Sequence, residues 1–319
     1  MKKKALSLVK FAGVSAGILG AASYAAFYEI MHRNAKLAPK LGTLFASESG
    51  LVAKTEPDAR QVWLDGQKFE EFEIINEKNY RLKGYLLPAD KPSDVYVFCS
   101  HGYRNCGKGE FGLIVKFYHD KGFNVFLVDH QAAGESDGKY IGFGYHEYTD
   151  CFRWLDLLKE RFGENIQIIL HGISMGCATV TMMSGSDRLP ENVKFIVADC
   201  GYTSAYDEFA HNIEGMHIPK FPIMNISNAI NKKLSGYEFK EANPLEAVKN
   251  AKVPMLFIHG GIDTFVPTRM VYELYDACTS EDKKLLVVEG AGHAESYPVD
   301  SETYEAMVCE FAEKYIGKS

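Results

Sequence analysis

The feature of this sequence that most constrains its fold is a regular alternation of short apolar runs with longer helical segments. Six runs of four or five residues, mostly β-branched or aromatic, occupy positions 95–99, 125–128, 166–170, 195–198, 255–258 and 285–288. Continuous apolar runs of this kind are typical of parallel strands that are buried on both faces. The intervening segments 110–119, 145–161, 175–184 and 269–277 predict helices. The pattern therefore predicts an α/β fold with a mostly parallel sheet and helices on both faces.

The sheet is expected to begin with an antiparallel hairpin, because apolar residues alternate over 69–75 and 80–87 around a polar turn. With 319 residues and 46% hydrophobic content, the chain can bury a sizeable core. We expect a polar connector over 31–68 and one domain over 69–319. A net charge of −7 argues against a general nucleic-acid binder, which needs a basic surface opposite the phosphates.

One long segment interrupts the alternation, since more than fifty residues without a strand pattern separate two of the later apolar runs. Within it, Ile223, Ile226, Ile230 and Leu234 recur at helical spacing. A long insertion in a compact fold is usually functional, so we predict a helical lid over about 203–250. Ile226 and Ile230 are the residues expected to contact a substrate. The alternative is a helix that simply packs on the body of the domain.

The N-terminus carries an uncharged run of 18 residues, 11–28, after four lysines. This length is at the lower edge of what spans a bilayer. We predict a membrane anchor over 1–30, with the domain outside the cytoplasm because the lysines precede the run. The alternatives are a signal peptide cleaved near Ser23-Tyr24-Ala25, which would make the protein secreted, and a cytoplasmic protein. The seven cysteines form no CxxC pair and favour free thiols, which argues for the cytoplasmic side.

A candidate nucleophile lies in Gly172-Ile173-Ser174-Met175-Gly176, between a predicted strand and a predicted helix. In a G-x-S-x-G turn the serine is exposed at the end of the sheet, and the helix N-terminus stabilises negative charge beside it. The motif alone occurs often by chance. Its position between strand and helix makes Ser174 the predicted nucleophile.

An acid and a histidine follow Ser174 in the order that such a site requires. Asp263 follows the run at 255–258 and has glycines beside it, whereas Asp199, after the preceding run, is the rival acid. Of the ten histidines, only His293 lies beyond both Ser174 and Asp263. We therefore predict that His293 takes the proton of Ser174 and that Asp263 orients its imidazole.

A tetrahedral intermediate on Ser174 would need two donors for its oxyanion. The backbone N–H of Met175 is the first, because Met175 directly follows the nucleophile. The backbone N–H of Tyr103 is the second, since His101-Gly102-Tyr103 begins the loop after the run at 95–99. The Tyr103 side chain either lines the substrate pocket or packs on the body.

Together these motifs resemble the α/β-hydrolase superfamily, in its branch of serine aminopeptidase-like and monoglyceride-lipase-like proteins. The resemblance extends from about residue 69 to the C-terminus, apart from the lid. It also includes the loop from Asp129 to Gly138, although Gln131 and Ala132 replace the arginine and glycine of the family's D-x-R-G-x-G pattern. The resemblance implies an α/β-hydrolase fold, and the long insertion adds the predicted helical lid to it.

The expected reaction is hydrolysis of a carboxylic ester through an acyl-Ser174 intermediate. The expected substrates are small-molecule esters, or lipid esters if an anchor holds the enzyme at a bilayer. A peptidase, a thioesterase or a non-catalytic binding member of the fold are the alternatives. No cofactor is expected, and no metal, because zinc-ligand spacing is absent from the sequence.

Overall fold

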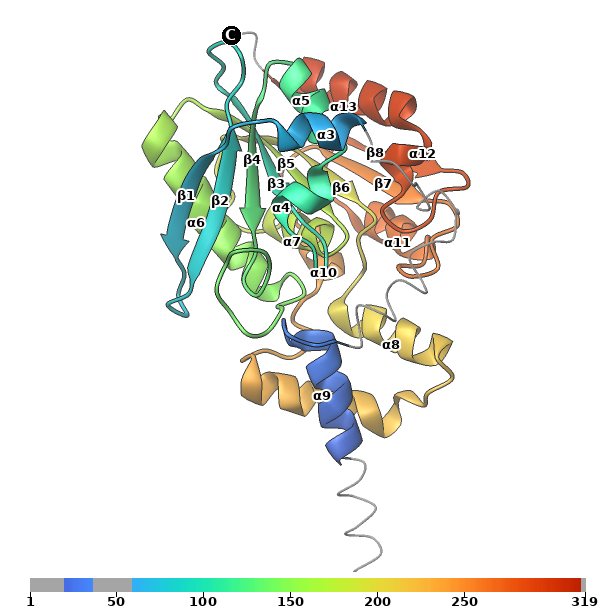
Figure 1. Ribbon diagram of the computed structural model, residues 1–319. Coiled ribbons are helices and arrows are strands. Elements are labelled where there is room, and N and C mark those ends of the chain that lie inside the picture. The colour runs from blue at the N-terminus through green and yellow to red at the C-terminus, as the bar shows by residue number, and fades with distance from the viewer. Residues whose placement is uncertain (1–19, 37–58, 317–319) are drawn as a thin grey trace, which may run out of the picture.

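The computed structural model describes residues 20–36 and 59–316. Its centre is an eight-stranded sheet with the strand order β1-β2-β4-β3-β5-β6-β7-β8 (Figure 1). The strands are β1 (Glu70–Ile75), β2 (Arg81–Leu87), β3 (Val95–Ser100), β4 (Asn124–Asp129), β5 (Gln167–Ile173), β6 (Val193–Asp199), β7 (Met255–Gly260) and β8 (Lys283–Val288). Each lies where the sequence predicts a strand.

Antiparallel pairing is confined to the start of the sheet, where β2 alone runs opposite to the other strands. β1 pairs with β2 and β2 with β4 in antiparallel register, whereas every pairing from β4 to β8 is parallel. The strand order reverses at β3, which lies between β4 and β5. In open α/β sheets, ligands bind beyond the carboxyl ends of the strands at such a reversal. This topology points to the loops after β3 and β5 as the functional end of the sheet.

Helices cover both faces of the sheet, as predicted. One face is covered by α6 (Tyr145–Phe162), α7 (Met175–Ser184), α10 (Pro244–Val248) and α11 (Arg269–Ala277). The other face is covered by α3 (Ala59–Asp65), α4 (Gly107–Phe111), α5 (Val115–Asp120), α12 (Ser296–Val299) and α13 (Ser301–Tyr315). Trp154 on one face and Phe111 on the other are fully buried. Each such side chain contributes about 1.5–3 kcal/mol of burial free energy. The single helix predicted over 110–119 is two short helices, α4 and α5.

A separate layer covers the carboxyl ends of the strands, and we call it the cap. It consists of α8 (Ala205–Gly215), α9 (Lys220–Leu234) and a helix over residues 20–31, here called the N-terminal helix (Figure 1). An apolar cluster joins these helices through side chains such as Phe27, Phe209 and Met224. The predicted lid segment extends too far, because Val248 of α10 packs in the core beneath the sheet rather than in the cap.

The N-terminal helix differs most from expectation. The sequence assigns its residues to an anchor that stands apart from the domain, yet Phe27 and Met31 are 2% and 0% exposed. The helix packs because its apolar side chains meet an apolar cap that the sequence pattern cannot show. Residues 1–19, which hold the first part of the uncharged run, lie outside the described residues. Among the helices of the described ranges, none combines the length and hydropathy needed to span a bilayer.

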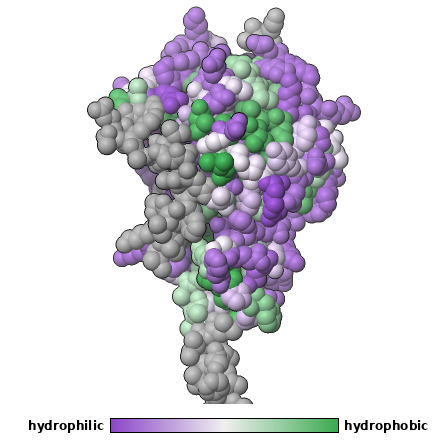
Figure 2. Space-filling model, turned by 90° about the vertical axis from the view of Figure 1, so that its right-hand side faces the viewer, coloured by the Kyte–Doolittle hydropathy of each residue, from purple (hydrophilic) through white to green (hydrophobic). Residues whose placement is uncertain are grey.

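The cap end of the molecule also exposes apolar side chains. Tyr24, Met216, Ile218, Phe221 and Leu234 are each at least 39% exposed, and all belong to the cap or to the turn between α8 and α9. Figure 2 shows green, apolar atoms among purple ones at this narrow end, and green patches on the body as well.

Candidate active site

Ser174 occupies a strained turn between β5 and α7. Its backbone has φ 57° and ψ −117°, a conformation that costs a non-glycine residue roughly 1–3 kcal/mol. The flanking glycines permit the turn, since a Cβ on Gly172 would lie 2.2 Å from the Gly176 oxygen, and one on Gly176 would lie 1.8 Å from the Ser100 oxygen. The turn places the serine at the N-terminus of α7, where the helix dipole favours negative charge.

The three residues predicted to form a triad meet although they are far apart in sequence. His293 Nε2 lies 2.8 Å from Ser174 Oγ, and His293 Nδ1 lies 2.7 Å from Asp263 Oδ2. With His293 neutral and protonated at Nδ1, the serine hydroxyl donates to Nε2 and the imidazole donates to the carboxylate. The geometry therefore contains a continuous hydrogen-bonded relay from Ser174 to Asp263.

Asp263 is fixed by a set of donors at the end of β7. Its Oδ1 accepts the N–H groups of Phe265 and Val266 at 3.0 and 2.9 Å. Its Oδ2 lies 3.2 Å from Nε2 of His259 in addition to its contact with His293. Burial alone would raise the pKa of this carboxyl, but the two histidines outweigh that effect and hold the pKa well below its usual range. Asp263 is therefore ionised under all ordinary conditions.

Asp199, the rival acid, has a different environment. It ends β6 and accepts a hydrogen bond from Tyr304 Oη at 3.1 Å. Burial raises its pKa to about 7. The carboxylate bonded to His293 is that of Asp263, so the structure assigns the two aspartates different neighbours.

The pKa of His293 departs from its ordinary value because of the carboxylates around it. Burial disfavours its charged form, but the Asp263 carboxylate, assisted by Glu208 and Glu110, outweighs burial and raises the pKa of His293 to about 9. An imidazole with a raised pKa is a stronger base once it is neutral.

The two predicted oxyanion donors lie on either side of Ser174. Met175 is the first residue of α7, and Tyr103 follows Gly102, where a Cβ would lie 3.2 Å from Ser174 Cβ. Glu110 holds this loop by accepting the Gly102 N–H at 3.0 Å. Within the described parts of the chain, neither the Tyr103 N–H nor the Met175 N–H donates to another protein atom. Both are thus free to bind an oxyanion.

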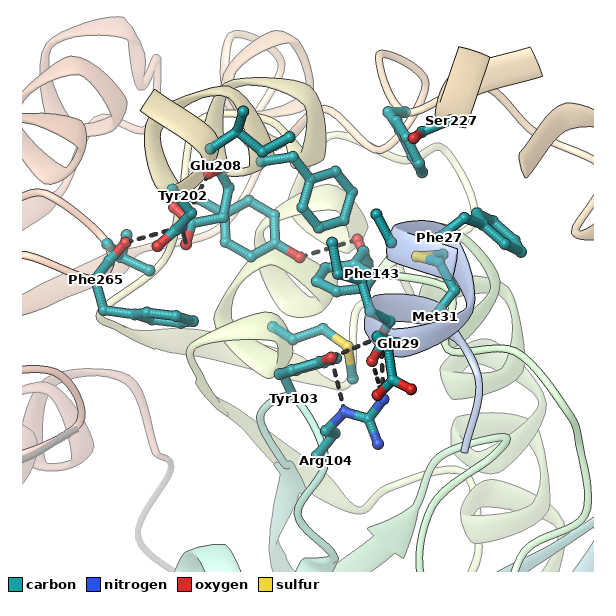
Figure 3. Close-up of a pocket in the computed structure, with 18 of the residues that line it drawn as sticks. Phe27, Glu29, Met31, Tyr103, Arg104, Phe143, Tyr202, Glu208, Ser227 and Phe265 are labelled. Carbon is teal, nitrogen blue, oxygen red and sulfur yellow. Dashed lines mark hydrogen bonds between the residues drawn. The ribbon is translucent and has the colours of Figure 1, made fainter. Parts of the chain in front are cut away.

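A cavity of about 760 Å³ lies between the cap and the sheet, with Ser174 and His293 in its wall. Its lining is mainly aromatic and aliphatic. It includes Tyr103, for whose side chain the sequence left two positions open, together with Phe143 and Tyr202 (Figure 3). Phe209 lines it as well. A pocket of this size and character suits an apolar ligand.

The residues of α9 that line this cavity differ from those predicted. Ile223, Met224 and Ser227 line it, whereas Ile226 and Ile230 do not. Ile226 lies two positions after Met224 and one before Ser227, so it points to a different side of the helix. Ile230 packs at the edge of the cap cluster, beyond the cavity.

The cavity wall also holds two carboxyl groups that the sequence analysis does not single out, the buried Glu208 and the partly buried Glu110. Glu110 and Glu208 both line the cavity, and burial raises the pKa of each, that of Glu208 to about 8. Glu208 Oε1 accepts Asn212 Nδ2 at 2.7 Å, while no group of the described chain bonds its buried Oε2. Glu208 follows Ala205 and precedes Phe209 on the buried side of α8, and a carboxyl on an apolar helix face is the signal that could have revealed it.

Known proteins resemble this chain in sequence and in fold. Residues 110–319 match the prolyl oligopeptidase family. YqkD of Bacillus subtilis is 27% identical over 272 residues, which cover 83% of this chain and 87% of that protein. Human monoglyceride lipase is 20% identical over 69% of this chain and 82% of the lipase. The structure of the Pyrococcus furiosus esterase Pf2001 superposes with a TM-score of 0.64 at 25% identity, over 83% of this chain and 97% of the esterase.

Proposed function

The chain belongs to the prolyl oligopeptidase family within the α/β-hydrolase superfamily, and from this we propose that it hydrolyses carboxylic esters through an acyl intermediate on Ser174. Membership confirms the resemblance that the sequence motifs indicated, and it makes the chain a serine hydrolase of the esterase and peptidase type. The observation that carries the proposal is the Ser174–His293–Asp263 relay in the wall of a large apolar cavity.

In the proposed reaction, Ser174 Oγ attacks the ester carbonyl carbon while His293 Nε2 takes the hydroxyl proton. The carbonyl oxygen becomes an oxyanion that accepts the N–H groups of Tyr103 and Met175. The C–O bond of the ester then breaks, and His293 returns the proton to the departing alcohol. A water molecule, deprotonated by the same histidine, releases the acid and restores Ser174 Oγ–H. Asp263 stays ionised throughout and stabilises the imidazolium.

The cavity supports an ester with an apolar acyl chain as the substrate. Its lining is contributed mostly by apolar side chains, and few polar groups are available to bind the backbone of a peptide. The exposed apolar side chains of the cap support a water-insoluble ester that is met at a lipid surface. If residues 1–19, before the N-terminal helix, also attach the protein to a bilayer, full-length protein should sediment with membranes.

The test is a panel of p-nitrophenyl esters with acyl chains of two to twelve carbons, assayed beside labelling with a fluorophosphonate probe. We expect hydrolysis with a maximum at an intermediate chain length, and labelling that the substitution Ser174→Ala abolishes. Loss of one triad member lowers turnover by roughly 10⁴–10⁶-fold. If the purified Ser174→Ala variant retained more than a trace of turnover, Ser174 would not be the nucleophile. Hydrolysis of peptides or thioesters in preference to oxygen esters would show that the proposed substrate class is wrong. If the probe did not label the full-length protein, the chain would be a binding protein rather than a hydrolase.

A further inference from the structure

We propose, on the basis of the hydrolase function above, that the N-terminal helix is part of the active site. It completes the wall of the acyl cavity, and it holds the loop that carries the Tyr103 amide. The segment that the sequence presents as a detachable anchor is then required for catalysis and for acyl-chain selection.

The first observation is that the helix forms one wall of the cavity. Ala22, Ala25, Ala26, Phe27 and Met31 all line it. Figure 3 shows Phe27 and Met31 on this helix, across the cavity from Glu208 and Tyr202. The alanines leave room beside the two large side chains. Without the helix the cavity would open to solvent, and an acyl chain would lose apolar contacts on that side.

The second observation is a set of hydrogen bonds between the end of the N-terminal helix and the loop that contains Tyr103 and Arg104. Tyr103 Oη donates to the Ile30 oxygen at 2.6 Å. Arg104 Nη2 donates to the oxygens of Glu29 and His32 at 2.7 and 3.0 Å. The last carbonyls of a helix lack partners within it, and a cation there also matches the helix dipole. Tyr103 and Arg104 therefore bind the helix with their side chains, next to the amide proposed to stabilise the oxyanion.

The backbone of Arg104, whose side chain makes some of these hydrogen bonds, is strained. Its φ is 58°, which is unfavourable for a side chain other than glycine. Its guanidinium Nε also donates to Tyr103 Oη at 2.7 Å, so the two residues and the helix form one hydrogen-bonded unit. Such strain persists only when the surroundings fix it, and here the carbonyls of the N-terminal segment provide part of that restraint.

A further attachment lies just after the helix. The Arg33 guanidinium donates to the Ser136 and Gly134 oxygens at 2.6 and 3.1 Å, and the Ile141 N–H donates to the Met31 oxygen at 2.8 Å. This is the loop in which Gln131 stands where the family pattern has an arginine. The N-terminal segment thus supplies a guanidinium to that loop and is hydrogen-bonded to two separate loops, this one and the loop of Tyr103 and Arg104.

A pair of truncations tests the inference in detergent-solubilised protein. Removal of residues 1–19 keeps the helix and should leave both kcat and the chain-length profile unchanged. Removal of residues 1–36 should lower kcat/KM for long-chain esters at least tenfold, the scale of lost apolar contacts. It should also lower kcat for short esters, because loss of one oxyanion donor costs up to roughly 10²–10³-fold.

Point variants keep the test decisive if the longer truncation does not fold. Phe27→Ala should shift the preferred acyl chain to greater length, and Phe27→Trp should shift it to shorter length. A residue with only a structural role would change the thermal midpoint without moving this preference in opposite directions. Tyr24→Ala is the matched control, because Tyr24 lies on the same helix, is 49% exposed and is absent from the cavity lining. Arg104→Gln should lower kcat at least several-fold with little change in KM.

The outcomes separate the two proposals. Suppose that the full-length chain hydrolyses esters and that the 1–36 truncation and the Phe27 variants have the same kcat and chain-length preference. The role of the helix is then refuted, while the hydrolase function stands. If the full-length chain neither hydrolyses esters nor reacts with a fluorophosphonate, the hydrolase function fails, and the role of the helix fails with it.

Discussion

Replacing Asp263 by asparagine tests how the structure sets the tautomer of His293. Asp263 Oδ1 accepts two backbone N–H groups, those of Phe265 and Val266, while Oδ2 accepts His293 Nδ1–H. The asparagine amide has only one oxygen. This oxygen must take the position of Oδ1, because an NH₂ group there would face the two backbone N–H donors and could not accept from them. The NH₂ then faces His293 Nδ1, which must act as the acceptor. The imidazole proton is thereby placed on Nε2, the atom that has to receive the proton of Ser174.

The expected loss follows from this wrong tautomer. In the serine-protease precedent, the same exchange lowers kcat by about 10⁴-fold with the geometry intact. At about 1.36 kcal/mol for each tenfold change, the barrier rises by about 5.5 kcal/mol. The variant should still fold, since the two backbone hydrogen bonds to the side-chain oxygen remain and the side-chain volume is nearly the same. Activity should therefore fall much further than the thermal midpoint.

The assay is kcat/KM on p-nitrophenyl butyrate together with the rate of fluorophosphonate labelling, each measured beside a thermal melt. Asp199→Asn is the matched control, because this aspartate is equally buried at a strand end but bonds Tyr304 rather than His293. We expect the control to lose less than tenfold. A larger loss in Asp199→Asn than in Asp263→Asn, or a loss below tenfold in Asp263→Asn, would refute the assigned role of Asp263.

Three further predictions follow from the site. Because the pKa of His293 is raised to about 9, kcat/KM should rise with pH as the imidazole becomes neutral. Glu208→Gln removes a nearby carboxylate and should move the midpoint of this pH profile to lower pH, whereas an unchanged profile would show that Glu208 does not raise the pKa of His293. Ile223→Ser should lower kcat/KM for long-chain esters about tenfold more than for short ones, while Ile226→Ser should affect both alike, because only the first lines the cavity. Gly176→Ala should prevent folding or abolish activity, since its Cβ would lie 1.8 Å from a backbone oxygen of β3; a stable, active variant would show that the turn can relax.

The sequence by itself determined the sheet and the candidate relay. Short buried strands and the helices between them leave patterns along the chain, so the sequence alone predicts the positions of all eight strands. Ser174, Asp263 and His293 could be named because each follows a strand, and parallel strands bring their carboxyl ends to one edge. The neighbouring glycines favour Asp263 over Asp199 in the sequence, and the distance from Asp263 to His293 agrees with that prediction.

The cap was decided only by the tertiary structure. The spacing of isoleucines in α9 indicates that one side of the helix is apolar, but not which residues meet a cavity. The sequence therefore predicts Ile226 and Ile230 at the cavity, whereas Ile223 and Met224 line it. An apolar run that follows lysines has the same composition whether it enters a bilayer or packs on the protein. Phe27 and Met31 became part of the cavity wall because the N-terminal helix meets α8, α9 and the Tyr103 loop, which lie far from it in sequence. Local patterns reveal which surfaces must be buried, whereas the partner that buries them depends on contacts between distant segments.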